Sequence, residues 1–170
     1  ARELHIPFMA GSSMPVGYRL KEHPLPMGTE IEAAVGIGFS GLEIYGFHAL
    51  EFLQWHLERR RGAETGVKSV QFLEGPAIWQ TVDAGVVSKD AFEAAFAAVP
   101  KTGTPDPRAD ENAAMFLFEY NDGLRAAIFM LRCVAGTSVG LKIKGQAAPT
   151  AISFDERTVP RHPHFACLLK

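Results

Sequence analysis

Residues 116–129 read FLFEYNDGLRAAIF, in which two apolar runs flank the turn Asn121-Asp122-Gly123. Asparagine, aspartate and glycine tolerate the left-handed backbone of tight turns, so this pattern favours a β-hairpin. Two further strand-like runs follow at 139–144 and 151–154. We therefore predict that the C-terminal part of the chain forms a mainly antiparallel sheet.

Upstream of the hairpin, strand-like and helix-like patterns alternate. Apolar residues at alternate positions predict strands over about 29–38 and 67–74, and a short apolar run predicts another over 6–10. Helices are predicted over about 42–61, 75–83 and 88–99. The expected fold class is α+β, an open sheet with the helices on one face.

Composition narrows the possible partners of the chain. The chain has 170 residues, of which 47% are hydrophobic, and this is enough for one domain with a substantial core. Its formal net charge of -2 gives no general attraction for nucleic acid, and no apolar run approaches the roughly 20 residues of a membrane helix. Cys133 and Cys167 are far apart and lack metal-type spacing, which favours a reducing, cytoplasmic compartment.

Both ends of the chain have the character of interrupted secondary structure. Residues 1–5 look like the last turn of a helix, and residues 164–170 look like the opening of one without a stop signal. We interpret the chain as a fragment of a longer protein. The alternative is a complete small protein that has lost its initiator methionine, and the location of the protein depends on which is true.

Residues 45–51 read YGFHALE and are the stretch most suggestive of chemistry. They follow the predicted strand and open the long predicted helix, and ligands often bind at such junctions. A neutral imidazole can accept a proton near pH 7, so His48 is the candidate acid or base. Glu51 follows one helical turn later and could orient the ring, and Tyr45 could stack on a sugar face. Each of these three side chains could instead serve packing alone.

Residues after the first predicted strand form a second group of candidates. Gly11, Ser12, Ser13 and Arg19 follow the carboxyl end of that strand, where nucleotide-binding sheets place their ligands. Hydroxyl and guanidinium groups suit a ribose, a phosphate or a polyol. A surface turn and a solvated arginine are the alternative interpretation. The histidines lack the spacing of a metal site, so none is predicted.

The order of these elements resembles the C-terminal portion of the glucose-fructose oxidoreductase and inositol dehydrogenase (Gfo/Idh/MocA) family. The resemblance rests on features that span most of the chain: the strand into Gly11-Ser12-Ser13, the Gly41 turn, residues 46–51, the strand at 67–71 and the Asn121-Asp122-Gly123 turn.

The resemblance implies a division of the chain and a chemistry. Residues 1–20 would be the remnant of a Rossmann nucleotide-binding domain, and residues 21–170 a substrate and oligomerisation domain. His48 falls on the family's catalytic histidine, whereas Ile44 stands where the family places an aspartate. NAD or NADP would be the cofactor, with Gly11 and Arg19 on its side and Ser12, Ser13, Tyr45 and Glu51 on the substrate side.

Two functional hypotheses follow. In the first, the complete protein is a nicotinamide-dependent oxidoreductase acting on a sugar, polyol or related cyclic substrate, and the 170-residue piece alone is inactive. In the second, the chain keeps the fold without the chemistry and serves as a carbohydrate-binding or assembly module. Both lead us to expect a homo-oligomer formed through the sheet.

Overall fold

The computed structural model of the chain describes residues 3–5, 11–17, 23–39, 41–102 and 106–154. Its centre is a six-stranded open sheet with the strand order β2-β3-β4-β1-β5-β6. The strands are β1 (Ile31–Phe39), β2 (Val67–Glu74), β3 (Ala114–Tyr120), β4 (Arg125–Leu131), β5 (Ser138–Ile143) and β6 (Thr150–Ser153). β1 and β4 run parallel, and every other neighbouring pair is antiparallel. The α+β class and the mainly antiparallel open sheet are confirmed.

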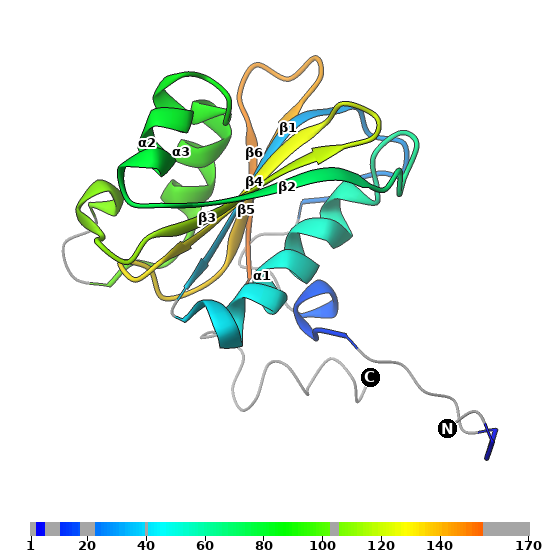
Figure 1. The fold of residues 1–170 in the computed structure, drawn as a ribbon. Coiled ribbons are helices and arrows are strands. Elements are labelled where there is room, and N and C mark those ends of the chain that lie inside the picture. The colour runs from blue at the N-terminus through cyan, green and yellow to red at the C-terminus, as the bar shows by residue number, and fades with distance from the viewer. Residues whose placement is uncertain (1–2, 6–10, 18–22, 40, 103–105, 155–170) are drawn as a thin grey trace.

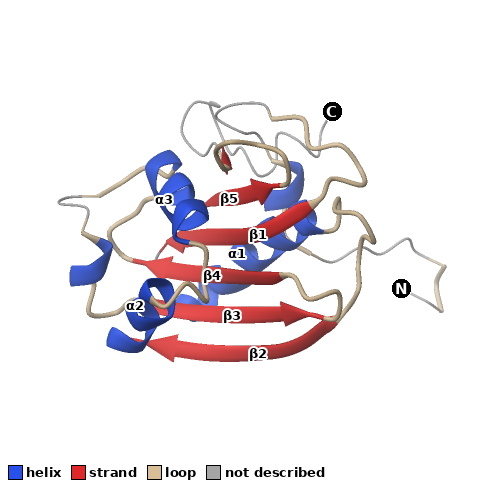
Figure 2. Cartoon of the chain, turned by 90° about the horizontal axis from the view of Figure 1, so that it is seen from above, coloured by secondary structure: helices blue, strands red, loops and turns tan. Residues whose placement is uncertain are grey.

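Helices cover both faces of this sheet. The helices are α1 (Leu42–Leu57), α2 (Pro76–Asp83) and α3 (Lys89–Ala98), and the two 3-10 turns are η1 (Met14–Val16) and η2 (Pro107–Ala109). α1 packs on one face, while α2 and α3 pack on the other, so that in Figure 2 α2 and α3 lie in front of the sheet and α1 behind it (Figures 1 and 2).

The prediction that the helices share one face is therefore wrong. Helices lie on both faces because the central strands carry apolar side chains on both sides, and both sides must be shielded from water. Along β4, side chains alternate between the two cores: Ala126, Ile128 and Met130 face α1, and Ala127, Phe129 and Leu131 face α2 and α3.

Most element boundaries agree with the sequence. The hairpin turn falls at 121–124, with Gly123 in the left-handed region at φ +85°. Ser88 caps α3, because its hydroxyl accepts the Ala91 N–H. α1 ends at Leu57 rather than near residue 61. The predicted strand at 6–10 and the predicted helix at 164–170 lie outside the described residues, as does half of the proposed Rossmann remnant at 1–20.

Glycines allow the helices to approach the sheet closely. A Cβ added to Gly38 of β1 would lie 2.8 Å from the Cβ of Ala49 in α1. A Cβ added to Gly140 of β5 would clash with the backbone carbonyl oxygen of Ala91 in α3. The first contact seats α1 against β1, and the second seats α3 against β5. No helix within the described residues has the length and apolarity to cross a membrane.

We predict that Gly140→Ala lowers the free energy of unfolding by about 3 kcal/mol, because the new methyl group meets helix backbone that cannot turn aside. Urea unfolding would measure this. Gly41→Ala is the control, since a Cβ there meets nothing within 4 Å, and it should cost only about 1 kcal/mol from the poorer N-cap of α1. Equal stability of the two variants would contradict the close approach of α3 to β5.

Candidate functional site

His48 lies in the second turn of α1 and is half-buried. The helix follows β1 closely, and the backbone carbonyl of Gly41 accepts hydrogen bonds from the N–H groups of Ile44 and Tyr45 in the first turn. Residues 11–17 run beside this part of the helix, where η1 packs against α1 (the dark-blue turn beside the cyan helix in Figure 1). The central strand and the N-terminal segment thus converge near His48.

A cluster of four residues, here called the His48 cluster, forms at this point. It contains Gly11, Ser12, His48 and Glu51. The Ser12 Oγ lies 2.7 Å from the His48 Nδ1. The Glu51 Oε2 is 3.5 Å from the position that a Cβ on Gly11 would occupy. The structure therefore brings together residues from both groups that the sequence singled out, although Ser12 and His48 are 36 positions apart.

The N-terminal segment is held in place by buried contacts. Met14 is only 2% exposed and belongs to the core on the α1 face. A Cβ added to Gly17 would clash with the ring of Phe154, which itself lies 6.2 Å from the Phe52 ring of α1 between centroids. Residues 11–17 are thus wedged between α1 and the end of β6. The position of Ser12 follows from this packing.

The remaining predicted site residues lie around the cluster or outside the described chain. Tyr45 is half-buried and packs on Phe39, with ring centroids 4.5 Å apart. Ser13 is half-buried and directly precedes η1. Ile44 is 67% exposed, so the position where the family places an acid faces away from the core. Arg19 lies outside the described residues.

The Ser12 hydroxyl and the His48 imidazole are groups that can exchange protons. A hydroxyl group and an imidazole in direct contact can pass a proton between them. Glu51 lies one helical turn from His48, so its carboxylate adds negative charge to the same part of the helix surface. Gly11 is exposed and has no side chain, which leaves its backbone open to a ligand.

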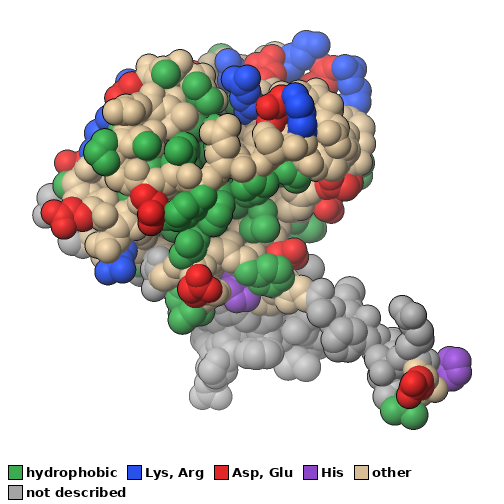
Figure 3. Space-filling model, viewed as in Figure 1, with side chains coloured by type: hydrophobic (Ala, Val, Ile, Leu, Met, Phe, Trp, Pro, Cys, Tyr) green, Lys and Arg blue, Asp and Glu red, His purple; other side chains and the backbone are tan. Residues whose placement is uncertain are grey.

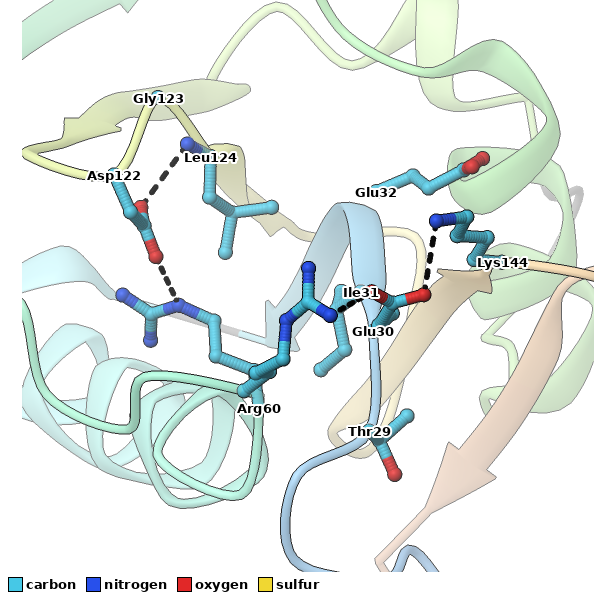
Figure 4. Close-up of a pocket in the computed structure, with 10 residues that line it drawn as sticks. Thr29, Glu30, Ile31, Glu32, Arg60, Asp122, Gly123, Leu124 and Lys144 are labelled. Atoms are coloured by element: carbon cyan, nitrogen blue, oxygen red, sulfur yellow. Dashed lines mark hydrogen bonds and ion pairs between the residues drawn. The ribbon is translucent and has the colours of Figure 1, made fainter.

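A separate polar hollow opens at the far end of α1. It has a volume of about 450 Å³ and is lined by Thr29, Glu30, Ile31, Glu32, Arg60, Arg61, Asp122, Gly123, Leu124 and Lys144. Figure 4 shows two sets of charges there: Glu30 pairs with Arg61 at 2.6 Å and Lys144 at 3.0 Å, and Arg60 pairs with Asp122. At 1.5 Å per residue, about 14 Å of helix separates His48 from Leu57, so this hollow is not part of the His48 cluster.

Arg60 is a residue whose role the sequence did not reveal. Its side chain is 2% exposed, and its Nε donates to Asp122 Oδ2 at 2.7 Å. Its other nitrogens donate to the Leu57 carbonyl and the Thr65 hydroxyl, and the guanidinium lies 4.8 Å above the Tyr120 ring centroid. The sequence shows three consecutive arginines after a helix, and nothing in that pattern distinguishes the buried one.

Arg60 also controls the ionisation of Asp122. Burial alone would raise the pKa of this carboxyl, but the hydrogen bonds from Arg60 and from the Leu124 backbone N–H outweigh it and hold the pKa below its usual value. The hairpin turn is thereby fastened to the end of α1. Nearby, burial raises the pKa of Tyr120 to about 12, and its hydroxyl donates to Gln54 Oε1 of α1 at 2.7 Å.

Within the part of the chain that the structure describes, no group of three or more His, Cys, Asp or Glu side chains is placed to hold a metal ion. Comparison of the chain with family models, with curated proteins and with solved structures found no match.

We predict that Asp122→Asn lowers the free energy of unfolding at pH 7 by about 2 kcal/mol, because it leaves the buried Arg60 guanidinium without its counter-charge. A carboxyl whose pKa is lowered by folding stabilises the fold above its unfolded pKa, and this contribution is lost as pH falls through the folded value. The difference between the variant and the wild type should therefore shrink between about pH 5 and about pH 2.

Chemical denaturation at several pH values would measure this, with Glu93→Gln as the control. Glu93 pairs with Lys89 at 3.7 Å, and both side chains are more than 60% exposed. Loss of that pair should cost less than about 0.5 kcal/mol at any pH. A pH-independent effect of Asp122→Asn would show that the Arg60 pair does not carry the stability.

Proposed function

We propose that this chain supplies the substrate side of a nicotinamide-dependent oxidoreductase acting on a sugar, polyol or related cyclic substrate. The observation that carries the proposal is the 2.7 Å contact between Ser12 Oγ and His48 Nδ1. This contact connects two parts of the proposed enzyme. One is the segment that would follow the nucleotide-binding domain, and the other is the helix that bears the candidate acid or base. A substrate bound beside this contact would lie next to both segments.

The chemistry of alcohol oxidation fits these groups. A hydride leaves the carbon for the nicotinamide, and the hydroxyl proton needs an acceptor that works near pH 7, which an imidazole provides. No glycine-rich phosphate loop occurs in the sequence, so we propose that residues upstream of Ala1 bind most of the NAD or NADP. Gly11 and Arg19 stay on the proposed cofactor side, and Ser12, Ser13, Tyr45 and Glu51 stay on the substrate side.

We predict that His48→Gln lowers kcat by about 100-fold or more in the complete protein with its nucleotide-binding domain, because proton transfer loses its acceptor. The complete protein would be screened against sugars and polyols with NAD and with NADP, and turnover followed by the absorbance of the reduced nicotinamide. His23→Gln, a half-buried histidine outside the His48 cluster, is the control and should leave kcat unchanged.

Turnover that survives His48→Gln unchanged would remove the catalytic role from this residue. Calorimetry on the isolated 170-residue chain gives an independent check. We expect no tight binding of NAD or NADP, and tight binding would contradict the assignment of the cofactor site to upstream residues.

A second candidate function, assembly, is favoured by the edge strand β2. Val67, Val70 and Phe72 are 47%, 52% and 46% exposed. They pair with Tyr120, Phe118 and Phe116 of β3, so all three point to the α1 side of the sheet. Among the described helices, α1 packs mainly on β1 and β4 and leaves these β2 side chains uncovered on this face. Figure 3, viewed as in Figure 1, shows hydrophobic side chains gathered across the middle of the visible surface.

An edge strand with exposed apolar side chains favours pairing or packing with another chain. The Phe72 ring already lies 5.0 Å from the ring of Phe116 between centroids, which extends the apolar surface across two strands. We propose a second copy of the chain as the partner that covers Val67, Val70 and Phe72. This assembly is compatible with catalysis, and it is also the function that would be left if the His48 cluster proved inert.

We predict that the protein forms a dimer and that Phe72→Asp converts it to a monomer with unchanged secondary structure, because a carboxylate cannot be buried at the apolar surface. Sedimentation would measure the mass and circular dichroism the fold. Gln71→Asp is the matched control: it introduces the same residue on the same strand but on the opposite face, and it should remain dimeric. A wild-type protein that stays monomeric at every concentration would contradict assembly through β2.

A further inference from the structure

We infer that Ser12 is the group through which His48 exchanges its proton. In this arrangement the Ser12 hydroxyl donates its proton to His48 Nδ1, so the neutral ring carries its own proton on Nε2. Ser12 Oγ, rather than the ring, then meets the substrate hydroxyl. The catalytic part of this inference rests on the proposed oxidoreductase function, whereas the position of the ring proton does not.

Hydrogen-bond accounting at Ser12 supports this direction. A serine hydroxyl has one proton to donate and two lone pairs. The Met14 backbone N–H donates to Ser12 Oγ at 3.1 Å and uses one lone pair. If His48 Nδ1 donated as well, Oγ would accept twice, and its own proton would have no acceptor among the described residues. If Ser12 donates to Nδ1 at 2.7 Å, each of these protons has an acceptor.

The packing of the two segments makes this contact a fixed one. Ser12 is followed by the buried Met14 and by Gly17, which lies against the Phe154 ring. His48 stands on a helix whose buried face includes the adjacent Ala49. Ser12 lies in the irregular segment between the exposed Gly11 and the buried Met14. The second hydrogen bond of a histidine sets which ring nitrogen carries the proton, and here that bond comes from Ser12.

The proton path follows from this arrangement. During oxidation the substrate O–H bond breaks and its proton passes to Ser12 Oγ, while the proton of Ser12 passes to His48 Nδ1. The hydride from the substrate carbon reduces the nicotinamide. The products are a carbonyl compound, the reduced nicotinamide and an imidazolium with protons on both nitrogens. Reduction runs the same path backwards.

Nuclear magnetic resonance on the 170-residue chain with nitrogen-15 histidine tests the ring proton directly. The measurement is made at about pH 9 on the neutral ring, which carries a single proton. We expect His48 Nδ1 to resonate as an unprotonated nitrogen and Nε2 as a protonated one. Ser12→Ala should shift this ratio toward that of free imidazole, while Ser12→Thr, which keeps the hydroxyl, should preserve it.

Two results would overturn the inference. One is a wild-type His48 with its proton on Nδ1, and the other is a proton ratio that Ser12→Ala leaves unchanged. The wild-type spectrum decides the first point even if the alanine variant fails to fold. The unchanged spectrum of His23 in each variant would show that any shift is local.

Kinetics of the complete protein test the catalytic part. Ser12→Ala should lower kcat by about 100-fold with little change in KM, Ser12→Thr should restore most of the loss, and Ser12→Ala should add little to His48→Gln. Full activity of Ser12→Ala would overturn the proton path. Absence of turnover in the wild-type complete protein would instead remove the oxidoreductase function and the path with it, while the resonance result would still decide the position of the ring proton.

Discussion

The closeness of the helices to the sheet is the constraint on which the other features depend. At Gly38 only a hydrogen atom separates the strand from Ala49 of α1, and at Gly140 the same is true of β5 and the backbone of α3. Protein interiors are packed as densely as organic crystals, so a gap or an extra methyl group at either point would move a whole helix. Because these contacts fix the position of α1 on the sheet, they also fix the position of His48 relative to the end of β1.

The His48 cluster is a product of the same packing. Ser12 reaches the ring because Met14 enters the core and because Gly17 leaves room for the ring of Phe154. Segments from the beginning and the end of the described chain therefore meet on one helix. A site built in this way is sensitive to core substitutions that never touch it, since a small shift of the supporting residues is enough to lengthen a hydrogen bond.

Local patterns predicted the elements better than their arrangement. The Asn121-Asp122-Gly123 turn and the start of a helix near residue 88 depend only on neighbouring residues, and the sequence predicted both correctly. The end of α1 was placed too late, because the arginines after it suit a helix terminus. The second layer of helices was missed, since small residues in β1 conceal how thoroughly that strand is buried on both sides. Helical spacing directed attention to Glu51 as the partner of His48, whereas the contact with Ser12 is tertiary and leaves no local signature.

The parallel pairing of β1 with β4 also bears on how the chain folds. The two strands that form this central pair lie roughly 90 residues apart in the sequence, and long-range pairing of this kind slows folding. The β3–β4 hairpin can form as soon as its turn closes, but the middle of the sheet stays incomplete until β1 inserts between β4 and β5. During synthesis, β1 therefore leaves the ribosome long before its partners exist. We expect this strand, rather than the hairpin, to set the rate at which the native sheet is completed.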